Sequence, residues 1–307
     1  ALMGAGSSGA LTIGVGDQTH QMFSDPRFLT LGIHYARLDV PWDAMSQPAV
    51  RAGVKAWLDA ARSDGVRPLI TFDHSQHRGL KRKLPSVRSF TRGFIHFRKS
   101  FPWVTDFAVW DEANYCGEPT CHRAALVAAY YKQMRHVCRG CDVVGGELLD
   151  EPNMVSWVRE FRKALRGEPM VWGLHNYIGA NRLQSKSTKR LLKATHAAIW
   201  FTETGGLVSR HNHSSTGFPE SASHAAKVTE FVFARLARLS SRIKRVYIYQ
   251  WNGPGPKSTW DSGLIAPNGG PRPAYEVFVR QLAKFGQLPT TRAAQSALAS
   301  ADAFHLH

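Results

Sequence analysis

The sequence alternates between strand-like and helix-like patterns eight times without a break. Short apolar segments predict strands at 11–16, 34–40, 67–74, 107–114, 142–147, 169–177, 197–204 and 245–251. Segments with apolar residues at helical spacing follow them, as in 48–64, where Val50, Val54, Trp57, Leu58 and Ala61 share one face. Because parallel strands need a crossover connection, this order predicts an α/β fold with a parallel sheet, and eight units favour a closed, single-domain (β/α)8 barrel.

The periodic patterns place the expected barrel at residues 11–288. Residues 1–10 would form an N-terminal extension, and 289–307, rich in Ala and Ser, would form a poorly ordered C-terminal tail. A nucleotide-binding sheet is disfavoured, because Gly14-Val-Gly16 lacks the third glycine of the phosphate-binding motif. We expect a monomer without a membrane span, since no apolar run approaches the roughly 20 residues that a bilayer requires.

The chain is strongly basic, with 39 Lys and Arg against 23 Asp and Glu and a net charge of +16. Such a charge attracts anionic partners. Nucleic acid is not expected, because no nucleic-acid-binding signature accompanies the charge. Basic residues are densest in 78–99, which is most simply a solvated loop and helix face. The alternative hypothesis is an anionic or envelope-bound glycan that contacts Lys81, Arg82 and Lys83.

Four cysteines, at 116, 121, 138 and 141, have a spacing similar to that of a zinc ribbon. The helix predicted over 123–137 would hold the two pairs roughly 20–25 Å apart, too far for one metal ion. We therefore predict the disulfides Cys116–Cys121 and Cys138–Cys141, with free buried thiols as the alternative. Disulfides imply an oxidising compartment, and thus a secreted or envelope-associated protein.

Polar and aromatic residues gather at the predicted C-terminal ends of the strands, where barrel enzymes carry their catalytic groups. They are Arg37, Asp39, Asp73, His74, Asp111, Glu112, Asn114, His175, Tyr177, Glu203, Trp251 and Asn252. Glu112 and Glu203 each end an apolar segment. We predict that these two carboxylates face each other across one active site.

These positions resemble clan A of the glycoside hydrolases, and the resemblance covers about residues 10–285. The matching motifs are Arg37-Leu-Asp-Val-Pro-Trp42 on the second strand, His74 on the third, His175-Asn-Tyr177 on the sixth, Thr202-Glu203 on the seventh, Tyr249-Gln-Trp251 on the eighth and the hairpin at 263–275. Families 5 and 39 are the most similar. The resemblance implies that Glu112 is the acid/base and Glu203 the nucleophile, held by Arg37 and approached by the Tyr177 hydroxyl.

Two positions depart from the clan pattern. The clan has Asn before the acid/base, where its amide binds the sugar 2-hydroxyl, and this chain has Asp111. A carboxylate accepts a hydrogen bond from a hydroxyl but donates one only when protonated. The clan's Pro after the acid/base is replaced by Ala113. Asp111 could mark an unusual sugar or a lower activity.

The sequence thus predicts a retaining glycosidase that cleaves a β-type bond in a poly- or oligosaccharide, with two carboxyls about 5–5.5 Å apart and without cofactor or metal. Predicted substrate contacts are Arg37, Asp39, Trp42, His74, Asp111, Trp172, His175, Tyr177, Trp251 and Trp260. The tryptophans, together with Trp110, would stack on sugar faces, with core packing as the alternative. Glu147 and Glu151 are less favoured catalytic candidates.

Two other functions remain open. One is a carbohydrate-binding barrel with little or no turnover, which the Asp111 departure supports. The other is a metal-dependent barrel hydrolase that uses His211-Asn-His213, although this pair falls in a Ser- and Gly-rich loop rather than on a strand.

Overall fold

The computed structural model describes residues 11–210, 217, 219–255 and 258–305. Eight parallel strands close into a barrel in the order β1-β2-β3-β4-β5-β6-β7-β9, which confirms the predicted fold. The strands are β1 Thr12–Gly16, β2 Tyr35–Pro41, β3 Arg67–Asp73, β4 Asp106–Ala108, β5 Asp142–Leu149, β6 Val171–His175, β7 Ala198–Thr204 and β9 Ile243–Tyr249. The predicted extension, residues 1–10, lies outside the described residues.

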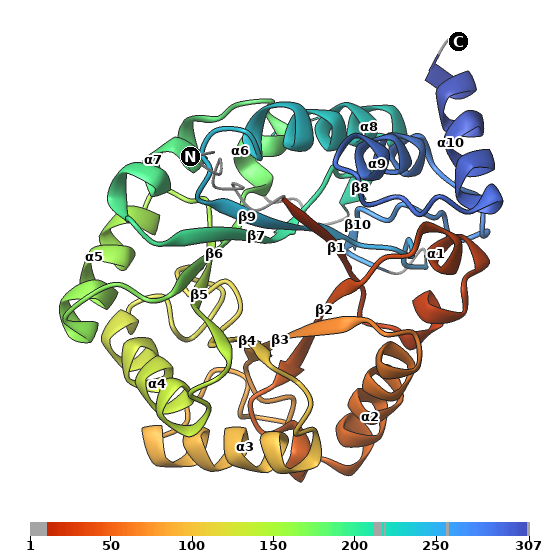
Figure 1. Cartoon of the computed structure of the whole chain (residues 1–307). Coiled ribbons are helices and arrows are strands. Elements are labelled where there is room, and N and C mark those ends of the chain that lie inside the picture. The colour runs from red at the N-terminus through yellow and green to blue at the C-terminus, as the bar shows by residue number, and fades with distance from the viewer. Residues whose placement is uncertain (1–10, 211–216, 218, 256–257, 306–307) are drawn as a thin grey trace, which may run out of the picture.

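Helices surround the strands on all sides (Figure 1). They are α1 Pro26–Leu31, α2 Pro48–Ser63, α3 Val87–Ser100, α4 Ala124–Val137, α5 Met154–Leu165, α6 Tyr177–Asn181, α7 Lys186–Ala194, α8 Ala222–Phe231, α9 Pro273–Lys284 and α10 Arg292–His305. Short 3-10 turns η1 His20–Ser24 and η2 Ala44–Ser46 and a π-turn η3 Val232–Leu236 complete the series. The apolar stripe predicted for α2 is buried against the barrel at Val54, Trp57, Leu58 and Ala61.

The prediction of a poorly ordered tail over 289–307 does not hold for Arg292–His305, which form α10. Alanine favours helix, and small side chains allow close packing. Ala294 and Ala301 are fully buried, and Arg280 of α9 donates a hydrogen bond to the Ala301 carbonyl. Helix α10 therefore covers part of α9.

The predicted strand over 107–114 is shorter in the structure, because regular pairing stops at Ala108. The following backbone still bonds to both neighbouring strands, through Asp111 N to the Phe72 carbonyl (2.8 Å) and Ala113 N to the Glu147 carbonyl (2.8 Å). Glu112 therefore projects from an irregular but anchored segment. The strand predicted over 169–177 also ends early, at His175.

A small antiparallel sheet joins two loops at the C-terminal end of the barrel. Strand β8 (Ser209–Arg210) follows β7, and β10 (Trp260–Asp261) follows β9. The two strands pair with Trp260 opposite Arg210. The sequence patterns do not predict this sheet, because each strand has only two residues.

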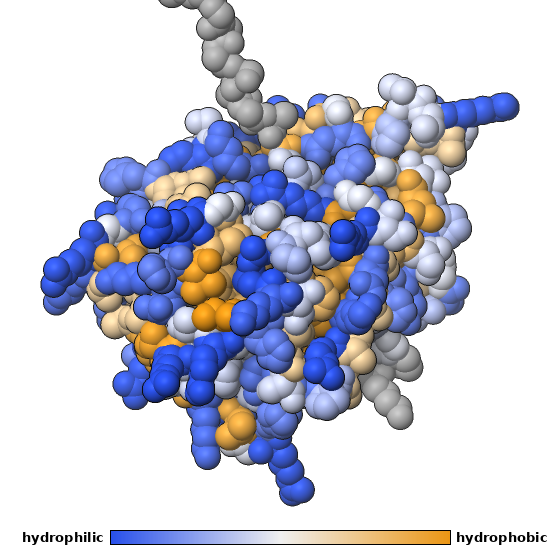
Figure 2. All heavy atoms as spheres, turned by 60° about the horizontal axis from the view of Figure 1, so that its bottom comes forward, coloured by the Kyte–Doolittle hydropathy of each residue, from blue (hydrophilic) through white to orange (hydrophobic). Residues whose placement is uncertain are grey.

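Both predicted disulfides are present, Cys116–Cys121 and Cys138–Cys141. They indicate an oxidising compartment. No helix in the described part of the chain is long and apolar enough to span a membrane. Figure 2 shows a face on which hydrophilic side chains predominate and hydrophobic ones form small, separate patches. Lys81, Arg82 and Lys83 are exposed, as expected for a solvated loop.

A buried ion network closes the N-terminal end of the barrel. Asp106, at the start of β4, is wholly buried and pairs with both Arg67 and Arg245. The guanidinium of Arg245 also lies 3.8 Å from the ring centre of Trp200. The same two arginines contact Asp142, whose side chain is 35% exposed.

We expect Asp106→Ala to lower the free energy of unfolding by about 3–5 kcal/mol, because it leaves the largely buried guanidinium of Arg245 without its main partner. Asp142→Ala is the matched control, and its loss should stay within about 1 kcal/mol, because that carboxylate is partly solvated. Urea unfolding followed by circular dichroism measures both. Equal losses in the two variants would contradict this account of the network.

Candidate active site

A cavity of about 760 Å³ opens at the C-terminal end of the barrel. This volume lies within the range of ligand sites in proteins, about 300–1,000 Å³. Its walls come from the loop after β1 and from the ends of β2, β4, β5, β6, β7 and β9. Both Glu112 and Glu203 line it. The structure thus brings the two predicted catalytic carboxylates to one cavity.

Glu203 is held at both of its carboxylate oxygens. Its Oε2 accepts a hydrogen bond from Arg37 (2.7 Å), and its Oε1 accepts one from the Tyr177 hydroxyl (2.9 Å). Burial and the nearby charge of Glu203 raise the pKa of Tyr177 well above its ordinary value. Tyr177 therefore remains a neutral phenol and a hydrogen-bond donor, which fixes the orientation of Glu203.

Arg37 is the fully buried centre of this end of the barrel. Besides Glu203, its guanidinium pairs with Asp39 (2.8 Å), Asp111 (2.7 Å) and Glu147 (2.5 Å). Burial opposes its charge, but these four carboxylates raise the pKa of Arg37 well above its usual value. Arg37 is therefore a permanent cation beneath the cavity.

Glu147 lies below the cavity floor rather than in it. The side chain is fully buried and accepts hydrogen bonds from Arg37 and from the Thr71 hydroxyl (3.0 Å). Burial opposes ionisation, but the charges of Arg37 and His175 hold the pKa of Glu147 far below its usual range. Glu147 is a buried anion that balances two cations, and its position does not fit a catalytic role.

Glu112 occupies a backbone conformation that is unusual for a residue with a side chain, with φ at +37°. Such strain persists only where the surroundings impose it, and it is common at functional sites. The Oε1 atom of Glu112 lies 3.3 Å from Nδ1 of His175, the last residue of β6. Glu112 and Glu203 thus have different partners.

His175 links the acid/base candidate to the buried anion. Its Nδ1 faces Glu112, and its Nε2 lies 3.4 Å from Glu147. Burial alone would lower the pKa of His175, but the charge of Glu203 and the bonds to Glu112 and Glu147 raise it to about 10. His175 is therefore an imidazolium at neutral pH. It is fully buried and outside the cavity wall, so it positions Glu112 instead of contacting a sugar as predicted.

Asp39 and Asp111 bring further negative charge beside Glu203. Each of the three residues has a carboxylate oxygen within 4.8 Å of the other two. Burial, with repulsion from Glu203, raises the pKa of Asp39 to about 7 although Arg37 opposes it. Burial and the neighbouring Asp39 likewise raise the pKa of Asp111 well above its ordinary value. This group therefore retains a proton near neutral pH.

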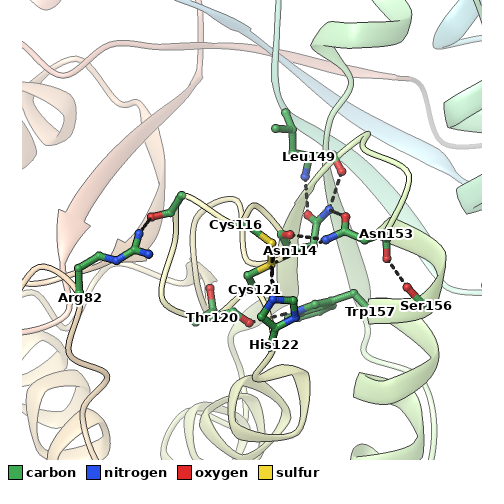
Figure 3. Close-up of a disulfide and its surroundings, with 11 residues drawn as sticks. Arg82, Asn114, Cys116, Thr120, Cys121, His122, Leu149, Asn153, Ser156 and Trp157 are labelled. Atoms are coloured by element: carbon green, nitrogen blue, oxygen red, sulfur yellow. Dashed lines mark hydrogen bonds between the residues drawn. A yellow bond between two sulfur atoms is a disulfide. The ribbon is translucent and has the colours of Figure 1, made fainter. Parts of the chain in front are cut away.

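The loop that carries Glu112 is fastened on two sides (Figure 3). Asn114 bonds to both the N–H and the carbonyl of Leu149, and its own carbonyl accepts a bond from Asn153 (2.8 Å). The Cys116–Cys121 disulfide then closes the loop beyond Tyr115, a residue that lines the cavity. These contacts hold the loop after β4 against the loop after β5.

Several residues that were predicted to contact the substrate do not line the cavity. Trp172 and Trp251 are fully buried and pack on aromatic core residues, Trp172 on Phe161 and Trp251 on Phe28. Trp110 is also fully buried, and none of the three reaches the cavity. Core packing, the alternative interpretation, therefore describes these tryptophans.

Trp42 and His74 also lie outside the cavity wall. Trp42 is partly buried and packs against Gly93 of α3. His74 lies between Asp73 (2.7 Å) and Glu118 (3.2 Å), and these two bonds raise its pKa to about 9. His74 thus ties the end of β3 to the loop after β4. Among the predicted tryptophans, Trp260 does line the cavity, with its ring 4.8 Å from that of Tyr177.

Sequence reasoning missed Tyr249, Gln18 and Arg210 on the cavity wall. The aromatic residue at the end of β9 is Tyr249, in the place predicted for Trp251. A strand that continued past Tyr249 would place Trp251 on the same face as Tyr249, because side chains alternate with a period of two. Because the strand ends at Tyr249, the backbone leaves that period and Trp251 turns into the core.

A metal ion has one candidate position among the described cavity residues, between Asp39, Asp111 and Glu203. The Arg37 guanidinium already contacts all three carboxylates, so a doubly charged ion would lie beside a fixed positive charge. The His211-Asn-His213 pair lies outside the described residues.

No model of a known protein family matches the sequence, and no curated protein matches it. Among solved structures, the fold is similar to that of a family 39 glycoside hydrolase from Bacteroides cellulosilyticus WH2, with TM-score 0.59 and 16% identity over 90% of this chain and 64% of that chain. It is also similar to an endo-1,4-beta-xylanase from Penicillium canescens, with TM-score 0.65 and 13% identity over 91% and 95% of the two chains.

A third similar structure is a family 128 endo-beta-1,3-glucanase from Amycolatopsis mediterranei, with TM-score 0.57 and 15% identity over 87% of this chain and 98% of that chain. At identities this low, the structural similarity shows a shared fold.

The raised pKa of His175 predicts how stability depends on pH. An imidazolium that is stabilised in the folded state contributes fully below the unfolded pKa, about 6.5, and the contribution disappears as pH rises towards 10. The free energy of unfolding of wild type minus that of His175→Gln should therefore shrink by a few kcal/mol between these pH values. Urea unfolding at intervals across that window measures the difference, and a constant difference would contradict the charged state.

The two disulfides allow a matched test of the loop. Removing the first with Cys116→Ser and Cys121→Ser should speed amide hydrogen exchange in residues 112–118 on the order of tenfold, because one of the two constraints is lost. Removing the second with Cys138→Ser and Cys141→Ser should leave that segment unchanged. Mass spectrometry of peptides that cover residues 112–118 compares the exchange rates of the two variants. Unaltered exchange in the first variant would mean that the Asn114 contacts suffice.

Proposed function

We propose that the protein is a retaining glycoside hydrolase that cleaves a β-type bond in a poly- or oligosaccharide by double displacement. The observation that carries the proposal is the pair of carboxylates on one cavity wall with contrasting partners. Glu203 is fixed by a guanidinium and a phenol, whereas Glu112 projects on a strained segment beside His175. Retaining and inverting cleavage both use two such carboxyl groups, and the resemblance of the strand-end motifs to clan A favours the retaining mechanism.

In the first step, Glu203 attacks the anomeric carbon while Glu112 gives its proton to the departing glycosidic oxygen. A covalent glycosyl ester on Glu203 results. In the second step, Glu112 takes a proton from water, the water oxygen bonds to the anomeric carbon, and the ester bond to Glu203 breaks. Arg37 and Tyr177 stabilise the carboxylate charge that Glu203 loses and regains.

The fold supports this proposal, since the similar structures are glycoside hydrolases of families 39 and 128 and a xylanase. Tyr249 and Trp260 line the cavity and supply aromatic faces for sugar rings. The two disulfides support a secreted or envelope-associated enzyme. A binding protein without turnover is the second candidate, favoured by Asp111 at the position where the clan pattern has an amide.

The test is a panel of aryl β-glycosides and oligosaccharides assayed with wild type, Glu112→Gln and Glu203→Gln. Glu112→Gln should lower kcat by about 10²–10⁴-fold, and Glu203→Gln should reduce it to background. The exposed Glu160→Gln is the control and should match wild type. NMR of the first-formed sugar should show the β-anomer.

An inverted first product would contradict the retaining mechanism, and an active Glu203→Gln variant would contradict the nucleophile assignment. Sugar binding by wild type, with no turnover of any glycoside, would favour the binding protein.

A further inference from the structure

The cavity is acidic although the chain as a whole is basic. Among the described residues of its wall, the acidic ones are Asp17, Asp39, Asp111, Glu112, Glu151 and Glu203. Arg210 is the single Lys or Arg among the described wall residues, because Arg37 lies beneath the wall. Salt screens charges beyond about 8 Å, so the basic outer surface contributes little inside the cavity. This arrangement does not favour the anionic glycan predicted from net charge, and Lys81, Arg82 and Lys83 are absent from the wall.

The surplus of negative charge is concentrated beside the proposed nucleophile. Asp39, Asp111 and Glu203 approach within 4.8 Å of one another, and Gln18 fixes Asp39 through a hydrogen bond of 2.6 Å. When Glu203 is in line with the anomeric carbon, the groups around it face the atoms next to that carbon. The substituent on carbon 2 is the nearest one that can carry a charge.

We propose that the cavity accepts a glycan whose sugar at the cleavage point is a 2-amino-2-deoxy sugar with a free amine, and that Asp39 and Asp111 bind its ammonium group. The inference rests on the proposed function, because Glu203 as nucleophile sets where carbon 2 lies.

The charge count around Arg37 supports a cationic occupant. Four carboxylates, Asp39, Asp111, Glu147 and Glu203, surround Arg37, and His175 is the second cation of the cluster. Without a ligand, the excess negative charge is relieved by a retained proton, since burial and repulsion raise the pKa of Asp39 to about 7. An ammonium group can replace that proton, which leaves to solvent. A neutral hydroxyl or acetamido group cannot.

A metal ion is the competing cation, and the geometry favours the ammonium. Ca²⁺ takes six to eight oxygen ligands, whereas three carboxylates converge here. Each of these carboxylates also contacts Arg37. A single positive charge that donates hydrogen bonds is repelled less by the guanidinium than a divalent ion.

The experiment compares aryl 2-amino-2-deoxy-β-glycosides with their 2-hydroxy and 2-acetamido counterparts, in the gluco, galacto and manno configurations. At about pH 6.5 the amine is protonated. Wild type should prefer the free amine in kcat/KM by at least about tenfold. Asp111→Asn and Asp39→Asn should each reduce this preference by about tenfold or more. Glu160→Gln, which removes an exposed carboxylate outside the cavity wall, should leave the preference within about twofold.

Equal or better turnover of the 2-hydroxy or 2-acetamido glycosides by wild type would overturn the inference while leaving the proposed function intact. A preference that persists in both Asp→Asn variants would overturn it as well. Circular dichroism establishes that each variant is folded.

Binding separates the inference from the proposed hydrolysis. If no glycoside is cleaved, calorimetric titration of wild type with short free-amine and N-acetylated oligosaccharides tests whether the cavity prefers the free amine. Tighter binding of the free amine, lost in Asp111→Asn, supports the inference although hydrolysis fails, and equal affinities overturn it. Titration with CaCl₂, MgCl₂ or MnCl₂ alone is the last arm. Binding of an ion below about 0.1 mM that Asp39→Asn abolishes would assign the cluster to a metal and overturn the inference.

Discussion

The contact on which the site depends is the buried pairing of Arg37 with four carboxylates. These carboxylates come from β2, the segment after β4, β5 and β7, so one guanidinium holds four separate parts of the barrel in register. Taking charges out of water is costly, and an apolar core would be at least as stable. The function of the cavity therefore explains this cluster better than a contribution to the stability of the barrel does.

The barrel gives two chemically identical side chains different surroundings. Glu203 belongs to strand β7, and its two carboxylate oxygens accept hydrogen bonds from Arg37 and Tyr177. Glu112 lies on irregular backbone whose position depends on the amide of Asn114, a disulfide and the imidazolium of His175. Two acids with distinct tasks need this kind of separation. A strand of the barrel supplies Glu203, and the segment after β4 supplies Glu112.

The order of strands and helices, the disulfide pairs and the convergence of Glu112 with Glu203 were predictable, because periodicity and strand-end position report which way a side chain points. The roles of Glu147 and His175 were not, since their importance comes from burial beside Arg37, which strand spacing does not encode. Trp251 was misplaced because the strand ends two residues earlier, at Tyr249. Arg210 was not predicted on the cavity wall, because strand β8, which places it there, has only two residues and gives no recognisable sequence pattern.

Closure of the barrel joins parts of the chain that are far apart in sequence. Strand β1 pairs with β9, and the side chain of Gln287 bonds to the backbone of Ile13 and Leu11. During synthesis β1 emerges first, so one of its edges has no partner until more than two hundred further residues have left the ribosome. Over that interval the nascent sheet presents an open edge that could pair with another chain. The barrel of this molecule is therefore without an open edge only after β9 has been made and paired.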